Sequence, residues 1–221
     1  MKLNLNLQFL IANLGLAVLW LGYFSPWVTA TPVALRLSAH DLVEWLTFVQ
    51  TVRDGTFPVS RLDLSLPLAG IALLAPFVPT LFDSHTPKRR FLLNSVYLLL
   101  GLFAAFLILP AFPYVLTAYN DPELGPQFWL GIVTGLSAIP LAVFAFLRPA
   151  WARWLIPVVS LTSIIFAIRA YTLVQPALTD TLRVIKPAPI GYGYVLYLIG
   201  GGILLILSTF PSVLKKLRPT Q

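Results

Sequence analysis

Residues 91–112 read FLLNSVYLLLGLFAAFLILPAF, an apolar run of 22 residues that contains no charged side chain. A helix rises about 1.5 Å per residue, so this run extends about 33 Å and can cross a hydrocarbon core of about 30 Å. Lipid offers no hydrogen bonds to backbone amides, and a helix satisfies them internally. The run therefore predicts a transmembrane α-helix.

Five further apolar runs resemble this one in length. The predicted spans cover residues 7–28, 63–82, 91–112, 127–147, 151–174 and 190–210. The chain is 58% hydrophobic and 10% charged, whereas about 25% of residues are charged in ordinary soluble domains. We predict a single integral membrane domain over residues 1–221, with an all-α fold. It is a polytopic transmembrane helix bundle of six spans in three hairpins.

The first predicted span shares features with a signal peptide, namely Lys2, an apolar stretch and the small residues of Val28-Thr29-Ala30. Its apolar stretch exceeds the roughly 7–15 residues of a signal-peptide core. We expect an uncleaved span.

Basic residues lie unevenly between the two sets of loops. With a cytoplasmic N-terminus, the inner side carries nine cations: Lys2, Lys88, Arg89, Arg90, Arg148, Arg153, Lys215, Lys216 and Arg218. The outer side carries five: Arg36, Arg53, Arg61, Arg183 and Lys186. Cations in short loops favour the cytoplasm. The sequence predicts a multi-pass protein of the bacterial cytoplasmic (inner) membrane, with its N-terminus and C-terminus both cytoplasmic.

The long loop after the first span predicts an amphipathic interfacial helix over residues 39–54. Ser38 and Asp41 have the spacing of a capping box, and Gly55 supplies a stop. Apolar residues recur at helical spacing at Leu42, Trp45, Val49 and Val52. Such a helix lies in the headgroup plane or caps its own bundle; a lid or partner-docking role is the alternative.

Small residues within the spans predict close helix packing. Gly200, Gly201 and Gly202 are consecutive, and Gly131 and Gly135 are four apart. Small residues allow helix backbones to approach in membranes, either inside the bundle or toward another subunit. Prolines within the spans predict kinks, which shape the packing or serve as hinges around a cavity.

Arg169 is the ionisable residue that the sequence places well inside a span, about five residues from the outer end of span 151–174. A long Arg side chain can reach the interface from that depth. We expect snorkelling or a structural ion pair, with Asp180, Asp121 or Glu123 as partner. Binding of an anionic headgroup or substrate is the alternative.

Motifs for chemistry are absent from the sequence. There is no Cys, which excludes thiolate catalysis and iron–sulfur ligation. The sequence also lacks HExxH, GxSxG, Walker A and Rossmann motifs. His40 lies near Asp41 and Glu44, a weak candidate metal site, and His85 lies in a solvated loop. We predict no enzyme activity and no catalytic, cofactor-binding or metal residues.

Aromatic residues gather at the predicted outer side, either as an interfacial belt or as a docking surface for a protein, lipid, quinone or pigment. This outer aromatic group consists of Trp27, Trp45, Tyr114, Tyr119, Trp129, Tyr192 and Tyr194. The candidate contacts for a partner or an anionic ligand are Arg169, Trp45, Trp129 and Tyr192.

The stretch Gly22-Tyr23-Phe24-Ser25-Pro26-Trp27, followed by Asp41-Leu42-Val43-Glu44-Trp45, resembles small multi-pass bacterial integral membrane proteins without a characterised activity. The resemblance covers residues 15–80 and implies a membrane location but no chemistry.

These observations predict a non-catalytic accessory subunit of a larger membrane complex, with a respiratory or photosynthetic electron-transfer assembly as host. Its partners would be membrane lipids and other integral membrane subunits, without nucleic acid. It would hold no cofactor by its own ligands; a surface lipid, quinone or pigment stays open. The alternatives are a small transporter or lipid-binding protein with an outward-facing cavity near Arg169, and a membrane organiser acting through the outer helix.

Overall fold

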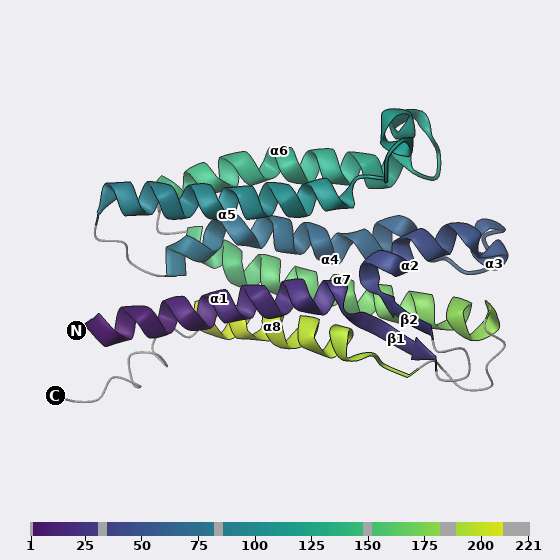
Figure 1. Cartoon of the computed structure of the whole chain (residues 1–221), viewed down its shortest axis with the longest axis horizontal. Coiled ribbons are helices and arrows are strands. Elements are labelled where there is room, and N and C mark those ends of the chain that lie inside the picture. The colour runs from purple at the N-terminus through teal and green to yellow at the C-terminus, as the bar shows by residue number, and fades with distance from the viewer. Residues whose placement is uncertain (1, 31–34, 82–85, 148–151, 182–188, 210–221) are drawn as a thin grey trace.

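The computed structural model describes residues 2–30, 35–81, 86–147, 152–181 and 189–209. Within these ranges, six helices are long and apolar enough to span a membrane. They lie side by side in an elongated bundle (Figure 1). The protein is therefore a multi-pass membrane protein by helix length and composition.

The long helices begin and end close to the predicted spans. Their bounds are α1 (Lys2–Phe24), α4 (Arg61–Leu74), α5 (Pro87–Ile108), α6 (Gly125–Leu147), α7 (Ala152–Thr181) and α8 (Tyr192–Thr209). The second span continues beyond α4 as the 3-10 helix η3 (Ala75–Leu81), where Pro76 and Pro79 lack the amide donors of a regular α-helix. Helix α7 runs past the predicted end at Val174 to Thr181.

Helix α4 is the central helix of the bundle. Together with η3 it forms the most enclosed span, in which 78% of the apolar stretch is buried. It packs against α5, α6 and α7. Its small residues permit this, since a Cβ on Gly70 would lie 2.6 Å from the Cβ of Ser163 on α7.

Helix α1 packs mainly against α8, which is distant in sequence. A Cβ on Gly200 would lie 2.6 Å from the backbone nitrogen of Leu19, and one on Gly22 would lie 2.6 Å from the Cα of Tyr197. Gly202, in contrast, faces open space. The predicted close packing at Gly200 is thus internal. Of the three predicted hairpins, α5–α6 and α7–α8 pack as consecutive pairs, whereas α1 has only limited contact with α4.

Tyrosine and serine side chains bridge the buried helices. Tyr197 of α8 donates to the carbonyl oxygen of Pro67 at 2.7 Å and also hydrogen-bonds Ser163 of α7. Tyr23 of α1 donates to the carbonyl of Leu64 at 3.1 Å. These bonds tie α1, α7 and α8 to the central helix.

The loop between α1 and α4 contains strands, so the all-α prediction was wrong in this part. Strand β1 (Pro26–Ala30) pairs antiparallel with β2 (Leu35–Ser38). Segment 189–191 joins this sheet, because Gly191 N donates to Trp27 O at 2.7 Å. The β-branched side chains of Val28 and Thr29 favour a strand. The first helix therefore ends at Phe24, before the predicted end of the span at Val28.

The predicted helix over 39–54 is divided into α2 (Ala39–Trp45), a 3-10 turn (Leu46–Phe48) and α3 (Gln50–Arg53). Val49 is extended, with φ −89° and ψ 108°, which ends the first part. The predicted Ser38–Asp41 capping box is confirmed. Gly55, the predicted stop, follows the end of α3 and has a positive φ of 74°. The apolar side of α2 is buried in the core at Ala39, Leu42 and Val43.

Candidate functional site: the first turn of the central helix

The first turn of α4 begins with a second capping box. The Ser60 hydroxyl accepts from Asp63 N at 3.3 Å, and Asp63 Oδ2 accepts from Ser60 N at 3.0 Å and from Ser60 Oγ at 2.7 Å. These bonds satisfy backbone amides at the start of the helix, which have no carbonyl partner in a preceding turn. They fix the start of the most buried helix and the direction of the residues that follow.

Asp63 also contacts the neighbouring helix α7. Its Oδ1 lies 3.4 Å from Nη2 of Arg169, which pairs the two residues. The Arg169 side chain is 61% exposed, whereas that of Asp63 is 12% exposed. The predicted partners Asp180, Asp121 and Glu123 were therefore wrong, although the expectation of a structural pair for Arg169 agrees with this contact.

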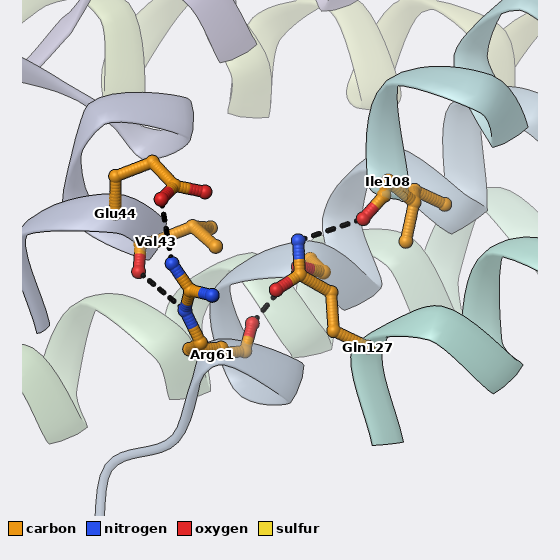
Figure 2. A network of polar contacts seen from close by, with 6 residues as sticks. Val43, Glu44, Arg61, Ile108 and Gln127 are labelled. Carbon is orange, nitrogen blue, oxygen red and sulfur yellow. Dashed lines mark hydrogen bonds and ion pairs between the residues drawn. The ribbon is translucent and has the colours of Figure 1, made fainter. Parts of the chain in front are cut away.

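Arg61, on the same turn, is a buried cation that sequence reasoning placed among solvated loop charges. Its guanidinium donates from Nε to the carbonyl of Val43 at 3.1 Å and from Nη2 to Glu44 Oε2 at 2.6 Å. Figure 2 shows Arg61 reaching from α4 toward α2, where both acceptors lie. A buried guanidinium needs such charge-assisted bonds. The repeated Ser-x-x-Asp spacing at 38–41 and 60–63 was the signal that could have placed Arg61 inside the helix.

Gln127 extends the polar contacts to α6. It is buried and donates from Nε2 to the carbonyl of Ile108 at the end of α5, at 2.7 Å. The Ser65 hydroxyl donates to the carbonyl of Arg61 at 2.9 Å. Polar contacts thus join α4 to α2 through Arg61 and to α7 through Asp63, and a nearby bond joins α6 to α5. Figure 2 shows the Arg61 contacts and the Gln127 bond together.

A cavity of about 550 Å³ opens beside this turn. Its polar lining comes from Arg53, Ser60, Arg61 and Glu123. Arg169 does not line it. The charges on the wall are of both signs, and the Arg61 guanidinium is bonded to Glu44, so the cavity wall is electrostatically balanced rather than strongly cationic.

The four predicted contact residues lie on four different helices. Trp45 ends α2 and packs, partly buried, against the core. Trp129 on α6 is 52% exposed and Tyr192 at the start of α8 is 58% exposed. Helices α6 and α8 lie at opposite edges of the bundle (Figure 1), so Trp129 and Tyr192 do not share one site.

The predicted outer aromatic group also includes buried members. Trp27 is fully buried and donates from Nε1 to the Gly22 carbonyl at 2.9 Å. Its ring lies 5.4 Å from that of Tyr194, which is 8% exposed. These two residues therefore form part of the core and not of an exposed belt.

The three residues of the weak candidate metal site, His40, Asp41 and Glu44, each contact a different group. The His40 ring lies 5.6 Å from the Phe24 ring, Asp41 caps α2, and Glu44 binds Arg61. Across the described ranges, no group of three or more potential ligands could hold a metal ion. His85, which the sequence assigns to a solvated loop, lies outside the described residues.

Tyr114 and Tyr119 of the predicted outer aromatic group lie in an exposed aromatic lobe in the connection between α5 and α6, together with Phe112 and Leu116, which the sequence did not single out. The lobe consists of Phe112, Tyr114, Leu116 and Tyr119, which are 78%, 62%, 65% and 51% exposed. Two 3-10 turns, η4 (Tyr114–Leu116) and η5 (Ala118–Asn120), fold it into a compact unit beyond the helix ends (Figure 1).

The fold and this site define a six-helix membrane bundle whose charged residues join helices to one another. No known family model, curated protein or solved structure matches the chain.

Proposed function

We propose that the protein is a non-catalytic accessory subunit of a larger membrane complex. The observation that carries this proposal is the use of the charged residues around α4. Arg61 binds Glu44 and Val43, and Asp63 binds Ser60 and Arg169. The Arg61 and Arg169 pairings each join two elements of the bundle, and the Ser60 bonds cap α4, which supports a structural role for these charges.

The aromatic lobe supports docking to another subunit. Large exposed apolar and aromatic surfaces commonly mark protein or membrane contacts, and aromatic residues are enriched at interfaces. The lobe stands beyond the ends of α5 and α6 (Figure 1), where it can reach the loops of a neighbouring membrane subunit. A respiratory or photosynthetic electron-transfer assembly is the proposed host.

The charge asymmetry supports a bacterial inner-membrane location with both termini cytoplasmic. In this orientation the β1–β2 sheet and the aromatic lobe face outward, and the start of α5 faces the cytoplasm. The proposed partner contacts then lie on the outer side, with Trp129 near the start of α6 and Tyr192 at the start of α8.

Purification in mild detergent from the native membrane tests the accessory role. We expect integral membrane subunits at fixed stoichiometry, with haem or chlorophyll absorption in the same fraction. The double variant Phe112→Ser/Tyr114→Ser should lose those subunits. Ile206→Ser, at a 57% exposed position on α8, is the matched control and should retain them.

A small transporter or lipid-binding protein is the alternative, favoured by the cavity of about 550 Å³ near Arg61. In that case Arg53→Ala, at an exposed cation of the cavity wall, should abolish translocation of a fluorescent anionic phospholipid in proteoliposomes while leaving the protein folded. Unchanged or absent translocation in both proteins would remove the alternative.

A further inference from the structure

A groove between α5 and α6 lies at the end of the bundle opposite the β1–β2 sheet. It has a volume of about 240 Å³ and is lined by Phe91, Asn94, Ser95 and Leu98 of α5 and by Ile139, Ala142, Val143 and Phe146 of α6. All of these residues belong to membrane-spanning helices. The lining is almost entirely apolar apart from Asn94 and Ser95, so its occupant must present an apolar chain to most of the groove.

Asn94 is the residue that points to a polar occupant. It is 6% exposed, and neither its side-chain nitrogen nor its oxygen has a hydrogen-bond partner within the described part of the chain. The neighbouring Ser95 hydroxyl donates to Phe91 O at 2.9 Å and makes no hydrogen bond to Asn94. A buried amide without partners costs free energy. A ligand carbonyl in the groove would accept from the Asn94 amide.

The helix turn before Asn94 carries positive charge. Helix α5 begins with Pro87, Lys88, Arg89 and Arg90, and its first turn has no acidic residue. The Arg90 Nε is buried and has no hydrogen-bond partner among the described residues. Arg90 and Asn94 are four residues apart, so they share a face of α5. The helix N-terminus carries partial positive charge, which repels these cations. A bound anion would stabilise both the cations and the helix terminus.

We propose that this groove binds one anionic phospholipid from the surrounding bilayer. Its phosphate would lie against Lys88, Arg89 and Arg90, an ester carbonyl would accept from Asn94 Nδ2, and the start of an acyl chain would fill the groove. In a phospholipid the phosphate and the first ester group are a few bonds apart. Arg90 and Asn94 are separated by about 6 Å along the helix, so one molecule can reach both. Basic pockets between spans are suited to such headgroups. This site is independent of the proposed accessory role and lies away from Arg169.

Native mass spectrometry of the full chain in detergent tests the site. Dioleoyl-phosphatidylglycerol and dioleoyl-phosphatidylcholine are added at equal concentration, because they share acyl chains and differ in charge. We expect one phosphatidylglycerol to be retained at least about fivefold more than phosphatidylcholine, and to raise the Tm by mass action. Inorganic phosphate alone should give no Tm shift. Equal retention of both lipids, or an equal shift with phosphate, would overturn the proposal.

Asn94→Leu separates the lipid contact from folding. Leu has a similar size and removes the unsatisfied amide, so the Tm without lipid should be unchanged or higher. Retention of phosphatidylglycerol should fall about fivefold. Ala142→Phe, which fills the groove from α6, should lower retention similarly, and Thr162→Leu, an exposed position on α7, is the control. Wild-type retention in Asn94→Leu or in Ala142→Phe would contradict the site.

Discussion

Asp63 divides its carboxylate between two partners: Oδ2 accepts from Ser60 in the capping box of α4, and Oδ1 lies 3.4 Å from Nη2 of Arg169 on α7. One side chain thus fixes the start of the central helix and joins it to a neighbour. This arrangement makes Asp63 more important for stability than the more exposed Arg169, and the difference can be measured.

Asp63→Ala should lower the free energy of unfolding by about 1–2 kcal/mol, because it removes the capping box as well as the ion pair. Arg169→Ala should cost less than about 1 kcal/mol, since its guanidinium is largely solvent-exposed. Unfolding in detergent, followed by circular dichroism, compares the two. A larger loss for Arg169→Ala would show that Arg169 has a further buried partner or ligand.

Gly200 and Gly202 provide a matched pair on α8. A methyl group at Gly200 would meet the α1 backbone at 2.6 Å, whereas one at Gly202 would meet nothing within 4 Å. Gly200→Ala should therefore destabilise the protein by about 1–3 kcal/mol through overpacking. Gly202→Ala should be neutral or slightly stabilising, because Ala favours the helix. Equal Tm values for the two variants would contradict the α1–α8 contact.

Gly70 and Ser163 should show a reciprocal rescue. Gly70→Ala places its Cβ 2.6 Å from the Cβ of Ser163 and should lower stability by about 1–3 kcal/mol. Adding Ser163→Gly removes the clashing atoms, although it also removes the hydrogen bond to Tyr197. The double variant should recover at least half of the loss. A double variant as unstable as the sum of both single changes would count against the α4–α7 contact.

Topology can be tested with single cysteines, because the natural sequence has none. Asn120→Cys in the lobe should react with a membrane-impermeant maleimide in intact cells, whereas Lys88→Cys at the start of α5 should react only after permeabilisation. Both positions are exposed in the structure, so accessibility depends on the side of the membrane. The reverse labelling pattern would overturn the orientation inferred from the basic residues.

The spans could be predicted from sequence because lipid imposes a simple requirement on length and polarity. Capping at Ser38 and termination at Gly55 could also be predicted, since both depend on local backbone chemistry. The α1–α8 packing could not, because the contact of Gly22 with Tyr197 joins residues far apart in sequence. Local patterns carry no information about which span lies beside which.

The charged site was harder to predict for a related reason. Asp63 is close to Arg169 because α4 and α7 are neighbours. The local sequence pattern favours the acids of the outer loops as partners instead. Burial of Arg61 depends on α2 folding back over α4 so that Val43 and Glu44 meet the guanidinium. A basic residue at the edge of an apolar run has the same local sequence pattern whether it is solvated or buried.

The most direct test of the accessory role is a stoichiometric count of co-purifying subunits from native membranes, with wild type and Phe112→Ser/Tyr114→Ser measured side by side. We predict a fixed ratio of integral membrane partners with wild type, and their loss from the folded double variant. A wild-type protein that purifies alone, as a colourless and folded monomer, would contradict the proposal.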